Sequence, residues 1–226
     1  GMSRLGWLCN EGHRTEAADA IAAVCALPGL EAEGIYTHFA NADGDEAYTM
    51  GQFTRFLELL SELEGRGITF PIRHCAASAA VLKYPCTHLD MVRPGVALYG
   101  HYPDPSCEGL DGVGLRPVMA LKTRVASVKA VPAGTPVSYG CTHVLERDAE
   151  LAALTVGYAD GLPRLCSDRL EVLIRGQRAP IVGRVCMDMC MADATGLGAA
   201  PGDEVELFGE HLPVEDAAAL AGTIQY

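Results

Sequence analysis

The sequence lacks three features that would each have defined a class of protein. It has nine cysteines but no Cys-x-x-Cys pair, so neither a disulfide framework nor a zinc ribbon is indicated. It has no long apolar run: the longest, residues 17–30, is broken by Asp19 and Pro28 and is too short to span a bilayer. Positive charge is scarce, with 17 basic against 29 acidic side chains. We therefore expect a cytoplasmic protein with no nucleic-acid and no membrane partner.

A metal site is not expected either. Cys186 and Cys190 are four residues apart, which is a spacing that two metal ligands can have. No second pair and no nearby histidine completes a tetrahedral set, so we expect these residues to be core thiols.

The first half of the chain alternates helical and strand patterns at short intervals. A helix is expected over 15–29, because Thr15 suits the N-cap position and Pro28-Gly29 ends the pattern. The segments expected after it are a strand at 30–39, a helix through 53–65, a strand at 72–78, a short helix at 78–85 and a strand at the start of 88–100. Such alternation implies right-handed βαβ crossovers and a parallel sheet, in a barrel or a doubly wound fold.

From about residue 113 the pattern changes to short β-branched runs separated by Gly and Pro, such as "LKTRVASVKAV" and "DEVELFG". This pattern is typical of an all-β domain. We therefore expect two domains, at 1–112 and 113–226, joined through the Gly- and Pro-bearing segment 102–117.

Arg93 stands in an apolar segment, "MVRPGVALYG". An unpaired buried charge costs on the order of several kcal/mol, so the guanidinium needs either solvent or a partner. One interpretation is that Arg93 marks a strand end and reaches water. The other is that it faces a ligand, because Gly95 follows and allows close approach to backbone N–H groups.

His38, Ser78 and Arg93 each close a predicted strand of the first half, where a parallel α/β barrel carries its chemistry. Ser78 precedes an alanine-rich helical segment, so its hydroxyl and the first N–H groups of that helix suit a phosphate. The alternative is that Ser78 is an ordinary N-cap. The segment "RPGVA" supplies a second set of N–H groups, so two loops are able to converge on one phosphate.

Seven short motifs run through the whole chain in a fixed order. They are "GMSRLG" (1–6), "YTHFANAD" (36–43), "HCAASAA" (74–80), "MVRPGVALYG" (91–100), and then "VSYG", "VGYADG" and "GRVCMD". On these motifs the sequence resembles the bacterial alanine racemases, pyridoxal-phosphate enzymes made of a barrel and a C-terminal β-domain. The resemblance implies the last strands of a TIM-like α/β barrel, followed by an all-β C-terminal domain.

The same resemblance assigns residues to the cofactor, pyridoxal 5'-phosphate. Arg93 is similar to the arginine that points at the pyridine nitrogen, and His38 to the histidine that holds this arginine. A permanently cationic arginine disfavours protonation of that nitrogen and makes the ring a weaker electron sink. Arg4 resembles the arginine that reaches the phenolic oxygen of the cofactor. The implied phosphate ligands are Ser78, Gly95, Val96 and Tyr226.

In the second half, Tyr139 of "VSYG" resembles the catalytic tyrosine, which a homodimer supplies in trans to the site of its partner. From the motif alone, a packed tyrosine of the β-domain is the alternative. Met187 is similar to the residue whose main chain contacts the substrate carboxylate, and Tyr158 and Arg164 to parts of the entrance. The implied reaction is two-base interconversion of L- and D-alanine for cell-wall peptidoglycan. The alternatives are a serine racemase of the vancomycin-resistance type and a non-catalytic pyridoxal-phosphate-binding homologue or fragment.

The sequence departs from the family in two places. The family's lysine that bonds covalently to pyridoxal phosphate lies in a K-A-N-A-Y-G type of motif, and none of Lys83, Lys122 and Lys129 has that context. Ala77 stands where relatives often have asparagine. We therefore expect an internal segment of a longer enzyme, inactive by itself.

Overall fold

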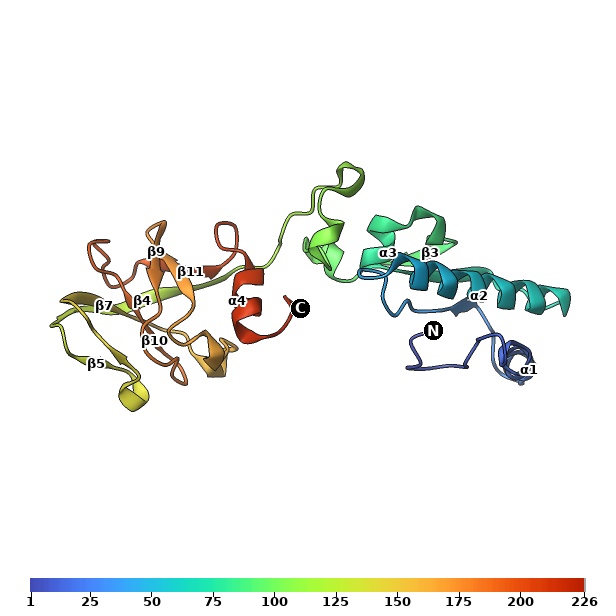
Figure 1. The fold of residues 1–226 in the computed structure, drawn as a ribbon, viewed down its shortest axis with the longest axis horizontal. Coiled ribbons are helices and arrows are strands. Elements are labelled where there is room, and N and C mark those ends of the chain that lie inside the picture. Colours follow the sequence, from blue (N-terminus) through green and yellow to red (C-terminus); the bar gives the residue numbers. More distant parts are fainter. Residues whose placement is uncertain (226) are drawn as a thin grey trace. The chain divides into compact units, whose positions relative to one another are not determined.

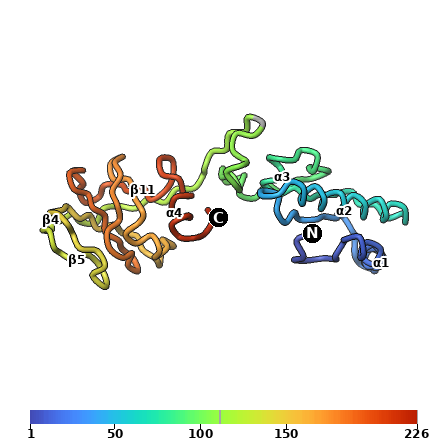
Figure 2. Tube along the Cα trace, in the orientation of Figure 1, coloured from blue at the N-terminus to red at the C-terminus, as the bar shows by residue number. Residues whose placement is uncertain are grey.

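The structure is a computed structural model that describes residues 1–225, and of Asp111 only the backbone. The chain forms two compact units, Gly1–Arg116 and a second that starts at Pro117, so the division lies within the segment 102–117 (Figure 1). Figure 2 traces the chain through each unit. Within the described residues, no helix is both long enough and apolar enough to cross a membrane.

The first unit is built on a three-stranded parallel sheet with the order β1-β2-β3. A helix or a pair of short helices separates each strand from the next, as a parallel sheet requires. Its elements are α1 (Arg14–Cys25), β1 (Gly34–Tyr36), α2 (Glu46–Gly65), β2 (Ile72–Ala77), α3 (Ser78–Lys83) and β3 (Met91–Arg93), with 3-10 helices at Pro85–Thr87, Val96–Tyr99, Pro105–Cys107 and Leu110–Gly112.

The helix α2, drawn in blue-green in Figure 1, shows how local sequence sets an element. Asp45 caps its first turn by accepting a hydrogen bond from the Tyr48 N–H at 2.9 Å. Apolar side chains then recur at helical spacing and are buried. Those buried along this face are Phe53, Phe56, Leu59 and Leu63.

Two sequence expectations for this unit are wrong in detail. The first helix begins at Arg14 with His13 as its N-cap, so Thr15 lies inside the helix and does not cap it. The helix ends at Cys25, before Pro28, because a helix seldom continues into the residue preceding a proline. The strand expected over 30–39 is limited to Gly34–Tyr36, the residues that pair with β2.

The second unit is a six-stranded antiparallel sheet with the order β10-β7-β4-β11-β8-β9, and a separate two-stranded pair, β5-β6. The expected strand 121–131 is observed as β4 (Leu121–Val131). The other strands are β5 (Pro136–Val137), β6 (His143–Val144), β7 (Ala149–Leu154), β8 (Glu171–Ile174), β9 (Gln177–Pro180), β10 (Cys190–Asp193) and β11 (Glu204–Phe208), with 3-10 helices at Tyr139–Cys141, Tyr158–Asp160 and Arg164–Cys166.

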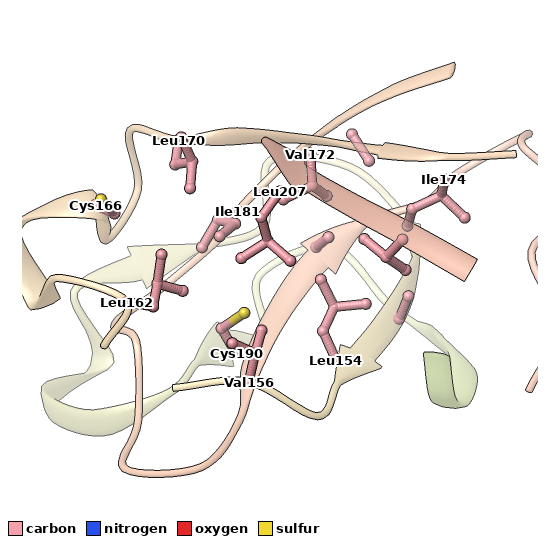
Figure 3. Packing of buried hydrophobic residues seen from close by; sticks show 14 of the residues in the cluster. Leu154, Val156, Leu162, Cys166, Leu170, Val172, Ile174, Ile181, Cys190 and Leu207 are labelled. Carbon is pink, nitrogen blue, oxygen red and sulfur yellow. The ribbon is translucent and has the colours of Figure 1, made fainter. Parts of the chain in front are cut away.

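The core of this unit is a cluster of aliphatic side chains that point toward one another from several strands and loops, as Figure 3 shows. Cys166 and Cys190 belong to it. Burial raises the pKa of Cys190 to about 12, so this thiol stays protonated. Cys186 is only partly buried. Among the described residues, no group of three or more metal-ligating side chains gathers at one place.

The second unit also contains a helix that was not predicted from the sequence, α4 (Val214–Ala221). It follows a turn built around Glu206, whose carboxylate accepts hydrogen bonds from the N–H groups of His211 and Leu212 at 2.8 and 3.2 Å. Burial alone would raise the pKa of Glu206, but these bonds and the His211 ring outweigh it and lower the pKa. Within the described residues, the β-domain therefore carries one α-helix after β11.

Candidate active site

Arg93 closes β3 and is partly buried, so the interpretation that it merely reaches solvent is wrong. Its Nη2 donates to His38 Nδ1 at 3.1 Å and to the Thr37 carbonyl at 3.3 Å, and its Nη1 donates to His74 Nδ1. Its guanidinium carbon lies 5.1 Å from the centroid of the Tyr36 ring, a cation–π distance. All of these groups are uncharged.

Both histidines that contact Arg93 are held in the neutral form. Burial lowers the pKa of His38, and the charges of Arg93 and Arg4 lower it further. Burial and then Arg93 likewise lower the pKa of His74. Since a guanidinium only donates, each Nδ1 must accept, and the ring proton therefore lies on Nε2.

No carboxylate among the described residues forms an ion pair with Arg93. Burial lowers the pKa of its guanidinium, although an arginine stays protonated in any case. The acceptors of Arg93 orient it without cancelling its charge. The consequence is a fixed cation, near Arg4, that is able to attract the lone pair or negative charge of a ligand.

Ser78 joins two loops. It is the first residue of α3, and Ala77 occupies the N-cap position, so the N-cap interpretation of Ser78 is wrong. Its Oγ accepts hydrogen bonds from the N–H groups of Gly95 at 2.8 Å and Ala97 at 3.2 Å. The end of β2 and the loop after β3 thus meet at one hydroxyl.

The other residues expected around the cofactor are placed as follows. Val96 is buried at the start of the 3-10 helix that follows Gly95. Arg4 lies near enough to His38 and Arg93 to shift the pKa of both, and its side chain is exposed. Tyr226 lies outside the described residues. All of these cofactor residues except Tyr226 fall in the first unit.

Tyr139 lies in the second unit, on the turn between β5 and β6, and its side chain is 69% exposed. The interpretation of a packed β-domain tyrosine is therefore wrong. The preceding residue, Ser138, has φ 64° and ψ −173°, which side-chain-bearing residues rarely adopt. Ser138 Oγ donates to the Arg184 carbonyl at 2.7 Å. The phenol is therefore exposed to solvent on a turn that is tied to the Arg184 main chain by the Ser138 hydroxyl.

Met187 belongs to a segment whose main chain is held by the turn after β7. The Tyr158 N–H donates to the Cys186 carbonyl at 3.0 Å, and the Ala159 N–H donates to the Met187 carbonyl at 2.8 Å. In a trans peptide the N–H is opposite the carbonyl, so the Met187 N–H points away from Tyr158. A Cβ on Gly157 would lie 2.4 Å from the Cys186 carbonyl oxygen, so only glycine permits this approach.

The two residues expected at the entrance are both exposed. Tyr158 begins one 3-10 helix and Arg164 begins another. The Arg164 carbonyl accepts from Ser167 Oγ at 2.6 Å.

His74 was not predicted as a site residue, although it lies within the motif "HCAASAA". His74 is paired in register with Tyr36 across β1 and β2, and the two rings are stacked at 5.1 Å. The sequence signal that could have identified His74 was an imidazole within a predicted strand, β2, next to the strand that carries Arg93, β3.

Two family models match the chain, and together they cover almost all of it. The model described as "Alanine racemase, N-terminal domain" matches residues 1–103, and the one described as "Alanine racemase, C-terminal domain" matches residues 118–226. The chain belongs to the alanine racemase family.

Curated relatives and solved structures agree with this family. The alanine racemase of Desulforamulus reducens is 50% identical over all of this chain, and that of Methanococcus maripaludis is 44% identical. This chain spans 60% of the first relative and 61% of the second. The Bacillus anthracis alanine racemase structure with bound L-Ala-P has a TM-score of 0.90 at 36% identity, over all of this chain and 58% of that one. The Clostridium difficile alanine racemase in complex with cycloserine has a TM-score of 0.89 at 36% identity, over 97% of this chain and 58% of that one.

These likenesses show a barrel-like domain followed by a C-terminal β-domain. The chain spans about 60% of the length of the curated relatives that it matches.

Proposed function

We propose that the protein is a pyridoxal-phosphate-dependent alanine racemase that interconverts L- and D-alanine and supplies D-alanine for peptidoglycan in the cytoplasm. The observation that carries this proposal is Arg93, a cation oriented by two neutral imidazoles and free of any carboxylate among the described residues. A site that needed a protonated pyridine nitrogen would place an acid there. A permanent cation such as Arg93, facing the pyridine nitrogen of the cofactor, would instead keep that nitrogen unprotonated.

The described residues fit the cofactor at both of its ends. Arg93 would face the ring nitrogen and Arg4 the phenolic oxygen, since both side chains are cationic donors. Ser78, with the backbone around Gly95 and Val96, would hold the phosphate, because two loops already converge on the Ser78 hydroxyl. When bound, the cofactor supplies a conjugated ring that withdraws electrons from the α-carbon of the amino acid.

Within this proposal Tyr139 moves a proton at the α-carbon on one face of alanine. Its phenol has a reference pKa near 10, so it needs cationic neighbours to act as a base at neutral pH. Those neighbours would belong to the first unit of a partner subunit, in a homodimer where Tyr139 acts in trans. A lysine outside this chain would serve the other face, and the first unit would be the last part of a TIM-like barrel. The Met187 N–H would bind the substrate carboxylate.

The test follows α-deuterium exchange of each alanine enantiomer by the whole protein with pyridoxal phosphate, with serine as a second substrate. Tyr139→Phe should slow exchange of one enantiomer far more than the other, by roughly a hundredfold to ten-thousandfold, because each enantiomer presents its α-proton to a different base. Equal losses for both enantiomers would contradict the assignment of Tyr139.

Subunit mixing tests the arrangement in trans. Tyr139→Phe subunits mixed with subunits that lack the cofactor-binding lysine should regain activity, because one mixed site then carries both intact residues. Verified mixed dimers that stay inactive would show that Tyr139 does not act across an interface.

A further inference from the structure

The turn that carries Tyr139 is anchored by its two short strands. Val137 of β5 lies opposite His143 of β6, so His143 is the residue at which the chain returns from the turn. His143 Nδ1 forms a pair with Asp168 Oδ1 at 2.9 Å. The far end of the turn is thereby tied to a loop 25 residues further along the sequence.

Asp168 makes a second contact with the same oxygen. Its Oδ1 accepts a hydrogen bond from the Gly183 N–H at 2.5 Å. The neighbouring Ser167 Oγ accepts a hydrogen bond from the Val185 N–H at 2.9 Å. The side chains of residues 167–168 thus bind the main chain of 183–185 at two points. One carboxylate therefore connects β6 with the segment that leads to Met187.

Gly183 closes the arrangement by contact with the near end of the turn. A Cβ on Gly183 would lie 2.7 Å from Ser138 Cβ and 2.8 Å from the Val137 carbonyl oxygen, and its φ is +77°. Ser138 itself has a backbone conformation that side-chain-bearing residues rarely adopt, and such a conformation persists only where surrounding contacts hold it. Both ends of the turn thus depend on one segment.

We infer that Asp168 and His143 act as a positioning pair for Tyr139. They hold the turn 138–142 against the segment 183–187, so that the phenol and the Met187 main chain keep one fixed spacing, and neither side chain touches the substrate. The inference rests on the proposed function, because it assigns the pair an effect on the proton transfer performed by Tyr139. Misplacement of a reacting group by about 1 Å is able to cost roughly a hundredfold in rate.

The same unit offers a matched control. Glu206 of β11 and His211 of the turn that follows β11 form a second histidine–carboxylate pair, at 3.2 Å. His211→Ala removes a pair of the same chemistry without touching the β5–β6 turn, so it should leave the rate of exchange unchanged. A loss common to both histidine variants would indicate general destabilisation and would overturn the inference.

The experiment compares Asp168→Ala, Asp168→Asn, His143→Ala and His143→Asn in the whole protein with pyridoxal phosphate. Asp168→Ala should lower kcat for the enantiomer that Tyr139 serves by about ten- to a hundredfold, with KM changed by less than about threefold. Asparagine at either position keeps a hydrogen-bonding group in place, so both asparagine variants should stay within about fivefold of wild type. The double variant Asp168→Ala/His143→Ala should be no slower than Asp168→Ala, because both changes break the same pair.

A second readout does not depend on activity. Amide hydrogen exchange of residues 138–144 should become faster in Asp168→Ala and His143→Ala, and stay unchanged in His211→Ala. If Asp168→Ala does not fold, His143→Ala and the two asparagine variants carry the same comparison. Unchanged amide exchange in 138–144, or equal slowing of both alanine enantiomers, overturns the positioning role.

Tyr139→Phe separates the two possible failures. If Tyr139→Phe slows one enantiomer and the alanine variants of His143 and Asp168 do not, the positioning pair is wrong and the proposed function stands. If Tyr139→Phe has no selective effect, the proposed role of Tyr139 fails. The amide-exchange result then decides only whether the pair holds the turn.

Discussion

The two units hold their candidate functional side chains by opposite means. In the first unit the functional group is a charge, Arg93, and all the groups that orient it are neutral. In the second unit the candidate group is the phenol of Tyr139, and a carboxylate contributes to the support of its turn. A carboxylate beside Arg93 would cancel the charge that the site offers to a ligand. Beside the β5–β6 turn, a carboxylate cancels no such charge and helps to fix the position of the turn.

The largest effect is expected where the cation of the first unit is itself replaced by an acid. Arg93→Glu should lower racemase activity by at least about a hundredfold, the scale for removing one preorganised electrostatic contact. It should also raise pyruvate release, because a glutamate would keep the ring nitrogen protonated and favour transamination. The control is Arg73→Glu, since Arg73 lies on the neighbouring strand β2 and pairs with Asp90 at the surface. An unchanged ratio of racemisation to pyruvate release would show that Arg93 does not tune the ring.

A smaller effect is expected at the hydroxyl that joins two loops of the first unit. Ser78→Ala leaves the N–H groups of Gly95 and Ala97 without their acceptor, which costs roughly 1–3 kcal/mol. We expect pyridoxal phosphate to bind about tenfold more weakly, measured by fluorescence titration. The control is Ser106→Ala, because Ser106 is exposed and its hydroxyl accepts a hydrogen bond from Lys83. Equal cofactor affinity in both variants would remove Ser78 from the phosphate site.

The charge of Arg93 should also be visible in the titration of its neighbours. Arg93→Gln should raise the pKa values of His38 and His74, measured by NMR, yet leave them below 6.5, because burial persists. Since the fold favours the neutral rings, their contribution to stability is complete above pH 6.5 and decreases as the pH falls through the folded pKa values. Acid should therefore destabilise the first unit less in Arg93→Gln than in the wild type. Identical pKa values in both proteins would contradict the proposed coupling.

The smallest effect concerns the second unit, where Glu206 is the carboxylate with the lowered pKa. Its stabilisation is complete above the ordinary value of 4.5 and is lost as the pH falls through the lowered pKa. Glu206→Gln should reduce the free energy of unfolding by about 1–2 kcal/mol at pH 7 and by less at pH 3. Amide exchange measured separately for each unit would show the first unit responding below pH 6.5 and the second only below 4.5. A common acid transition would break the contrast between them.

Much of the fold was accessible because the decisive interactions are local. The strand 121–131 and the helix that ends at Gly65 follow from side-chain periodicity and from Gly and Pro boundaries. The N-cap of the first helix, His13, was not accessible, because Thr15 is a residue type that commonly caps helices and lies only two positions further along the chain. The strand Cys190–Asp193 was also missed, because it is short and its pattern is set by its pairing with β7.

For the candidate site, the sequence by itself determined the residue types at strand ends and turns: Arg93 and Ser78 in the first unit and Tyr139 in the second. It determined Arg93 and Ser78 because glycine, proline and apolar periodicity locate strand ends without knowledge of contacts. Tyr139 was implied only by the resemblance of "VSYG" to the motif of the family. Only the tertiary structure decided that a second imidazole, that of His74, joins His38 at Arg93. It alone also decided that Ser78 bonds the loop after β3 instead of capping its helix, and that Asp168 reaches His143. Each of these contacts joins residues at least 17 positions apart, and the register between strands and loops that brings them together depends on packing of the whole unit.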